Sequence, residues 1–109
     1  MAGPAPELEQ IARRLREELG RMGVRVQRVL AFGSYARGEQ REGSDIDLIV
    51  VSGDWRGRGR RERLEILGVA AARLLEPIQA LGFTPEEIAS GAVGKFWQTI
   101  LEEQAVVVL

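Results

Sequence analysis

Two aspartates near the middle of the chain, Asp45 and Asp47, are the residues whose types and spacing best suit catalysis. They stand one residue apart at the start of the apolar run Ile46 to Val51, which is typical of a β-strand. Because side chains alternate along a strand, both carboxylates would leave the same face with their Cα atoms about 6.6 to 6.8 Å apart. Carboxylates placed in this way can share a divalent cation, whereas the alternative is an exposed strand end that binds nothing.

A glycine and a serine, Gly33 and Ser34, form the second candidate site. They follow the apolar segment Val29 to Phe32 and open a predicted helical turn. Free backbone amides and a hydroxyl at such a turn can bind a phosphate group, and glycine permits its close approach. Ser34 could serve as a helix cap as well as a phosphate ligand. Together with the two aspartates, this turn would hold a metal-bound nucleoside triphosphate.

The sequence around these residues resembles the signature of a known family. The run GSYARG, the spacing of eight positions from Arg37 to Asp45 and the run SDIDLIVV are similar to the motif of the minimal nucleotidyltransferases of the DNA polymerase β-like superfamily. The resemblance implies an α/β (α+β) fold, in which helices flank a small mixed β-sheet. It implies that Gly33 and Ser34 bind the triphosphate. It also implies that Asp45 and Asp47 are the catalytic residues and hold two Mg²⁺ ions.

One position departs from the pattern of that family. The family commonly supplies a third carboxylate from the next strand, and its pattern would place that acid near Gln79. Glutamine can neither bind a metal as an anion nor accept the acceptor's proton. Glu76 is the nearest acid, but it precedes Pro77 and is expected at the end of a helix. The departure favours a rival hypothesis, a nucleotide-binding regulatory module that has lost catalysis and acts by holding a partner protein.

The leading hypothesis implied by the resemblance is a Mg²⁺-dependent nucleotidyltransferase. It would transfer a nucleoside monophosphate, AMP from ATP in the first instance, to a hydroxyl of a partner protein or another acceptor. Members of the family often pair with a small helical protein of the HEPN type, frequently as antitoxin and toxin, and some add AMP to that partner. We expect one domain over residues 1–109, which leaves no room for a separate acceptor-recognition domain.

The composition narrows the chemistry further. The chain has no Cys and no His, which removes disulfides, zinc fingers, thiol nucleophiles and imidazole catalysis. Its formal net charge of −1 argues against a protein that coats nucleic acid, so RNA binding through Arg56 to Arg63, with Trp55 as a stacking platform, is the weakest hypothesis. No apolar run could span a bilayer, and Met1 to Gly20 lacks the apolar core of a signal peptide, so we expect a cytoplasmic protein.

A small set of elements must position these residues. Apolar spacing predicts helices over 7–19, 64–75 and 94–104. Apolar and β-branched runs predict strands over 24–32, 46–51 and 78–83, and the glycine-containing segment 52–59 predicts a loop. The segment TPEE, which begins at Thr84, predicts a capping box and a short helix.

Three side chains in or next to the motif have structural as well as functional interpretations. Arg37 and Arg41 are expected to pair with Glu39 or Asp45 rather than to bind phosphate. Tyr35 is expected to pack rather than to stack on a base.

The apolar tail Ala105 to Leu109 has high β-propensity and no charge, so it must be covered. It could dock onto the sheet of its own domain. Pairing across a homodimer or against a second protein is the favoured prediction, because a domain of this size has limited sheet surface with which to cover it.

Overall fold

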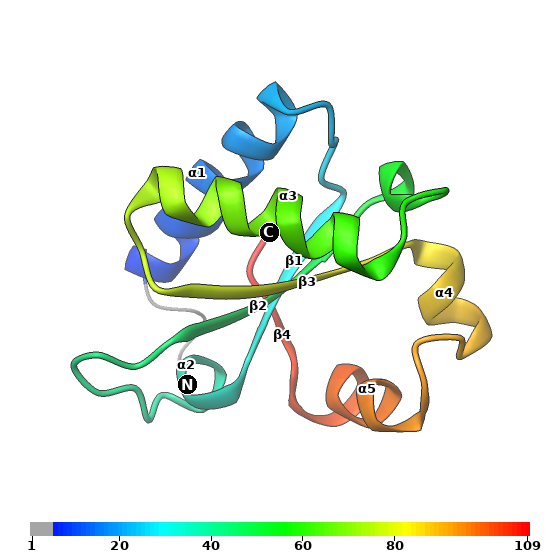
Figure 1. Cartoon of the computed structure of the whole chain (residues 1–109). Helices are drawn as coiled ribbons and strands as arrows, with labels where there is room; N and C mark the ends of the chain where they lie inside the picture. The colour runs from blue at the N-terminus through cyan, green and yellow to red at the C-terminus, as the bar shows by residue number, and fades with distance from the viewer. Residues whose placement is uncertain (1–5) are drawn as a thin grey trace.

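A computed structural model describes residues 6–109 of the chain. A four-stranded mixed sheet with the strand order β3-β2-β1-β4 forms the centre of the molecule (Figure 1). β1 pairs antiparallel with both β2 and β4, and β2 pairs in parallel with β3. This arrangement confirms the predicted fold class. The strands are β1 Arg28–Phe32, β2 Ile46–Val51, β3 Ile78–Phe83 and β4 Val106–Val107.

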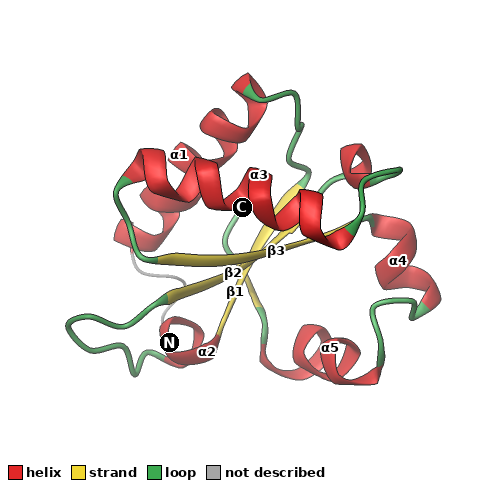
Figure 2. Cartoon of the chain, in the orientation of Figure 1, coloured by secondary structure: helices red, strands yellow, loops and turns green. Residues whose placement is uncertain are grey.

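Helices cover both faces of this sheet (Figure 2). Two long helices lie on one side, and the short C-terminal helix α5 lies on the other (Figure 1). The helices are α1 Pro6–Arg21, α2 Gly33–Arg37, α3 Arg60–Leu74, α4 Pro85–Ser90 and α5 Lys95–Thr99. α5 runs on into a π-helical turn, Ile100–Gln104, so the two together fill the helix predicted over 94–104. The predicted capping box is present at Thr84, whose side chain accepts a hydrogen bond from the Glu87 amide.

The sheet separates two apolar layers. In one layer, α1 and α3 pack against the side chains of β2 that include Leu48 and Val50, both fully buried. In the other, Ile49 and Val51 pack with Trp97 of α5. Fully burying one such side chain stabilises the fold by about 1.5 to 3 kcal/mol, so β2, covered on both faces, is the rigid centre of the molecule. No helix within residues 6–109 is long and apolar enough to cross a membrane.

The first strand is shorter than predicted. β1 begins at Arg28 rather than at Val24, although Val24 is fully buried in the core. The reason lies in the partner strand, because Arg28 pairs with Val51, the last residue of β2. Upstream of Arg28 the partner strand has ended, so the chain is held by single contacts such as the Gln27 amide on the Val51 carbonyl (2.8 Å).

The segment predicted as a loop over 52–59 contains a 3₁₀ turn, Gly53–Trp55. Trp55 is fully buried and its indole N–H donates to the Val50 carbonyl at 3.1 Å. The prediction that Trp55 could stack on RNA is therefore wrong. The indole lies against Gly82 of β3, where an added Cβ would come within 2.6 Å of the ring.

The apolar tail is covered within the chain. Val106 and Val107 form β4 on the free edge of β1, the Val108 amide donates to the Val29 carbonyl at 2.8 Å, and the Val108 side chain is buried. The favoured prediction, that the tail pairs with another chain, is wrong, because β1 had an edge left on which the tail could dock. Association of the chain as a whole, with a second copy or with another protein, stays a prediction.

Candidate active site

Asp47 lies at the centre of the candidate site, near the beginning of β2. It is in register with Phe32 on β1 and with Gln79 on β3, so these three side chains share one face of the sheet. Asp45 lies one residue before β2 and is exposed, whereas Asp47 is half-buried. Between them Ile46 is buried in the opposite layer, as the alternation predicted. The structure thus places both carboxylates at the N-terminal end of β2.

Gly33 lies directly against Asp47. It opens α2 with φ at +72°, in the left-handed region, and a Cβ built on it would overlap the Oδ2 atom of Asp47. Any side chain here would therefore strain the backbone and displace the carboxylate. The sequence analysis predicted that this glycine lets a phosphate approach, and the structure adds that the same glycine makes room for the Asp47 carboxylate.

Ser34 is the second residue of α2, so the prediction that it caps this helix is wrong. The N-cap position belongs to Phe32, and no side chain bonds there. Within residues 6–109 no hydrogen bond engages the Ser34 hydroxyl, which leaves that hydroxyl available to a ligand. Tyr35 packs against the larger core layer, as predicted.

Electrostatics at this point favour a cation. Burial raises the pKa of Asp47, the negative charge of Asp45 raises it further, and Arg37 opposes both effects. Arg37 itself donates to Glu39 at 2.9 Å, which confirms its predicted structural pairing. Because the charge of Asp45 disfavours ionisation of Asp47, a cation bound between the two carboxylates would relieve this repulsion. Carboxylate oxygens are the ligands that Mg²⁺ prefers, and Asp45 is exposed to solvent, so the residues present fit that ion.

The third carboxylate is missing, as the sequence predicted. Gln79 is in register with Asp47 on the neighbouring strand, which is the position where the family pattern expects an acid. Glu76 lies 3.7 Å from Arg14 in an ion pair. Within the part of the chain that the structure describes, no three acidic side chains are grouped so that they could hold a metal together. The candidate site therefore consists of the two carboxylates, Asp45 and Asp47, and the neutral side-chain amide of Gln79.

The arginine-rich segment is largely neutralised within the fold. Arg58 pairs with Glu62 at 2.8 Å, Arg56 pairs with Glu86, and Arg63 pairs with Glu87. These three guanidinium groups are therefore engaged by acidic side chains of the same chain.

One contributor to the site was not predicted. Trp97 of α5 packs edge-on against Phe32, with ring centroids 5.3 Å apart, and also contacts Phe83 at 6.0 Å. It therefore covers the sheet face on which Asp47 lies. The only sequence signal was an aromatic residue in a predicted helix, which does not say what that helix covers.

Comparison with known proteins decides the family. Residues 8–101 match the family described as "Nucleotidyltransferase domain". The chain belongs to this family. The resemblance drawn from the GSYARG and SDIDLIVV runs is therefore confirmed.

A curated relative covers part of this nucleotidyltransferase domain. It is "Putative protein adenylyltransferase MJ1215" of Methanocaldococcus jannaschii, which is 48% identical over 44 residues. The matched stretch is 40% of this chain and 50% of the relative, so it spans half the length of that protein.

Two solved structures share the fold. A structure described as a "putative nucleotidyltransferase from Sulfolobus solfataricus" has a TM-score of 0.63 at 18% identity, over 93% of this chain and 78% of its own. A second, described as "the toxin-antitoxin with AMP-PNP", has a TM-score of 0.58 at 22% identity, over 94% of this chain and 72% of its own. At these identities both structures bear on the fold of the nucleotidyltransferase domain.

Proposed function

We propose that this nucleotidyltransferase domain transfers AMP from ATP to a hydroxyl of a partner protein. The observation that carries the proposal is the contact between Gly33 and Asp47, which joins the predicted phosphate turn to the predicted metal ligand. The adenylyltransferase description of the curated relative supports the choice of ATP and of a protein acceptor.

Each residue has a defined part in the proposed reaction. The backbone at Gly33 and the hydroxyl of Ser34 hold the triphosphate, and Asp45 and Asp47 would hold Mg²⁺. When bound, the metal neutralises charge that develops on the α-phosphoryl group and favours ionisation of the acceptor hydroxyl. The acceptor oxygen forms a bond to the α-phosphorus as the bond from that phosphorus to the bridging oxygen breaks. Pyrophosphate leaves with the electron pair, and the hydroxyl proton passes to solvent.

The chain itself contributes position more than covalent chemistry. β2 is packed on both faces, so Asp47 on this strand and Asp45 directly before it are held by a rigid element. Trp97 packs against Phe32, the register partner of Asp47. Holding reacting groups in a fixed geometry is itself a large source of rate acceleration. Without a third carboxylate, the chain places no strong base beside the acceptor, and we expect transfer to be slow.

The partner proposed for the chain is a helical protein of the HEPN type, with this chain as antitoxin. Support comes from the fold shared with a structure described as a toxin–antitoxin with AMP-PNP. The second candidate function is a nucleotide-binding module without catalysis, which Gln79 favours. The two functions agree on nucleotide binding and differ in whether AMP becomes covalently attached.

Titration calorimetry with Mg-ATP tests the binding site that both candidates share. We expect Asp45→Asn and Asp47→Asn each to weaken Mg-ATP binding by at least tenfold, because each variant removes one of the two carboxylates that the chain offers the metal. Glu42→Gln is the matched control, since Glu42 is an exposed acid in the loop that leads to the site. Equal affinity in all four proteins would show that the aspartates do not hold the metal.

A further inference from the structure

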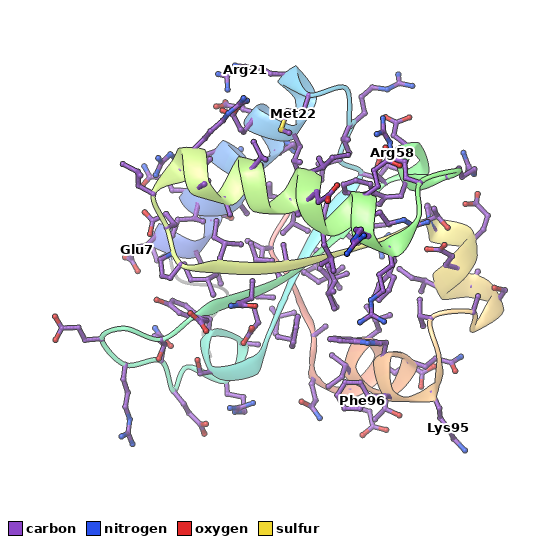
Figure 3. The ribbon with its side chains drawn as sticks, in the orientation of Figure 1. Glu7, Arg21, Met22, Arg58, Lys95 and Phe96 are labelled. Atoms are coloured by element: carbon purple, nitrogen blue, oxygen red, sulfur yellow. The ribbon has the colours of Figure 1, made fainter. Side chains whose placement is uncertain are left out.

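A cavity of about 380 Å³ opens beside the C-terminal half of β3. This volume lies within the range of natural small-ligand sites, roughly 300 to 1,000 Å³. Its walls come from the loop before α3, where Arg58 lies (Figure 3), from the first turns of α3, from β3, and from the segment that joins α4 to α5. Residues that matter for its chemistry are Arg58, Arg60, Arg63, Leu81, Phe83 and Trp97. None of the motif residues Gly33, Ser34, Asp45 and Asp47 belongs to it.

Two of the three arginines that line this cavity, called the β3 cavity below, are paired with acidic side chains. Arg63 makes a bidentate pair with Glu87 at 2.8 and 2.9 Å, and Arg58 donates to Glu62 at 2.8 Å. Arg60 forms no ion pair with any residue among 6–109. The remaining walls are apolar. The cavity therefore suits a ligand with one anionic group on an otherwise uncharged body.

The β3 cavity lies on the same sheet face as Asp47. Leu81 is two residues beyond Gln79, so the two side chains share a face with Cα atoms about 6.6 to 6.8 Å apart. Gln79 in turn is in register with Asp47. Trp97 lines the cavity and also contacts Phe32, the register partner of Asp47 on β1. One extended segment could thus have one side chain in the cavity and another beside the carboxylates.

The cavity and the phosphate turn lie on opposite flanks of β2. Gly33 reaches Asp47 from the end of β1, whereas the cavity borders β3, and β2 runs between those two strands. In phosphoryl transfer the attacking and leaving oxygens lie on opposite sides of the phosphorus. With the leaving pyrophosphate at Gly33, the attacking hydroxyl must come from the β3 side.

We propose that the β3 cavity is the acceptor subsite, and that it binds an acidic side chain two residues from the hydroxyl that receives the nucleotide. Arg60 pairs with the acidic group, and the hydroxyl residue lies beside Gln79 and Asp47. This inference rests on the proposed transferase function, and it names the acceptor as an acidic peptide segment. A nucleic acid would present many phosphates, and one unpaired arginine beside Glu62 and Glu87 does not match them.

Two peptides and the two tryptophans of the chain test the binding step. Each peptide carries a serine, with a glutamate two positions on in one and a glutamine there in the other. The indole N–H resonance of Trp97, which lines the cavity, should shift on titration by more than that of Trp55, which is fully buried behind Gly82. We expect the glutamate peptide to bind the wild-type chain about tenfold more tightly, as for one charge-assisted hydrogen bond.

Arg60→Gln should abolish this preference for glutamate. Arg61→Gln is the matched control, because Arg61 is the next residue of α3, is exposed and does not line this cavity. The proposal is overturned if Trp97 does not respond, if the two peptides bind equally, or if both variants lose the preference to the same extent. A stronger response of Trp97 to an oligoribonucleotide than to the glutamate peptide would also overturn it.

Label transfer from α-labelled ATP to the same peptides tests the acceptor role. At low peptide concentration, the glutamate peptide should be labelled about tenfold faster than the glutamine peptide by the wild-type chain, and equally fast by Arg60→Gln. Equal labelling by a wild-type chain that binds Mg-ATP and prefers the glutamate peptide at Trp97 would overturn the acceptor role alone. Failure of Mg-ATP to bind would instead overturn the proposed function and leave the peptide result to stand.

Discussion

Asp47 is the residue at which binding chemistry and stability oppose each other. Burial and the charge of Asp45 raise its pKa, so ionisation of Asp47 is less favourable in the folded chain than in the unfolded chain. This unfavourable contribution is present at neutral pH and disappears as pH falls below both pKa values. Asp47→Asn should therefore leave the free energy of unfolding at pH 7 unchanged or slightly higher, within about 0.5 kcal/mol, while Mg-ATP binding weakens by at least tenfold.

Urea denaturation at pH 7 and near pH 3 measures this effect. The small advantage of Asp47→Asn at pH 7 should vanish at the lower pH, where the wild-type carboxylate is also neutral. A clear loss of stability in the variant at pH 7 would show that Asp47 serves the fold rather than a ligand.

Alanine substitutions at Gly33 and Gly43 distinguish the effect of backbone strain from the effect of crowding the Asp47 carboxylate. Both have positive φ, but a Cβ on Gly33 would overlap Asp47 whereas a Cβ on Gly43 would meet nothing within 4 Å. Gly33→Ala and Gly43→Ala should each lose about 1 kcal/mol of stability through the backbone. Only Gly33→Ala should also lose Mg-ATP binding by titration calorimetry. Wild-type affinity in Gly33→Ala would contradict the site geometry.

Gln79 is the position at which activity should be gained. Because Gln79 is in register with Asp47, Gln79→Asp would add a third carboxylate on the same face. We expect this variant to raise the rate of AMP transfer from α-labelled ATP, or to create transfer where the wild-type chain has none. If Gln79→Asp leaves the rate unaltered and Glu76→Gln abolishes it, then Glu76 supplies the missing group instead.

Residues of the site could be predicted from the sequence because the motif is local. Gly33, Ser34, Asp45 and Asp47 lie within one strand–turn–strand stretch, where spacing alone fixes which side chains share a face. Trp97 could not be predicted, because its contact with Phe32 joins positions far apart in the chain.

At the scale of elements, the ion pair between Arg63 and Glu87 holds α3 to the start of α4. The Arg63 guanidinium lowers the pKa of Glu87, burial opposes this, and the capping amide of Thr84 lowers it further. The pair is largely shielded from solvent, so Glu87→Gln should cost about 1 to 2 kcal/mol of unfolding free energy at pH 7. The stabilisation is present above the unfolded-state pKa of about 4.3 and is lost as pH falls through the lower folded-state pKa.

Denaturation at pH 7 and near pH 3 tests this pair. Glu86→Gln is the control. Glu86 lies on the same helical turn as Glu87 and pairs with Arg56, but both side chains of that pair are exposed. We expect little change in that control, and convergence of Glu87→Gln with the wild type at low pH. A loss in Glu87→Gln that persists near pH 3 would point to altered packing rather than to the ion pair.

Elements with strong periodicity could be predicted, whereas those that depend on a distant partner could not. The helices α1 and α3 and the strand β2 follow from apolar spacing within each segment. The start of β1 depends on where β2 ends, and β4 depends on the free edge of β1. Trp55 is buried because Gly82 of β3 leaves space for its ring, which the glycine- and arginine-rich sequence around Trp55 does not reveal.

In the whole molecule, one face of the sheet packs the larger apolar core and the other carries the candidate site. α1 and α3 cover one face with the larger apolar layer, and α5 lies on the other face (Figure 1). That second face carries Asp47 and Gln79, and Trp97 of α5 lines the β3 cavity at its edge. The family resemblance predicted this architecture from a short motif. The cavity could not be predicted, because its walls come from three segments that only the fold brings together.

If this chain transfers AMP, the α-phosphate and the γ-phosphate of ATP must end in different products. The chain and the proteins that co-purify with it are incubated with Mg²⁺ and with ATP labelled at either the α- or the γ-phosphate. We predict covalent label on an acceptor protein from α-labelled ATP only, lost in Asp47→Asn, because the γ-phosphate leaves in pyrophosphate. Acceptor labelled from γ-labelled ATP would contradict AMP transfer, and so would a chain that binds Mg-ATP and labels nothing.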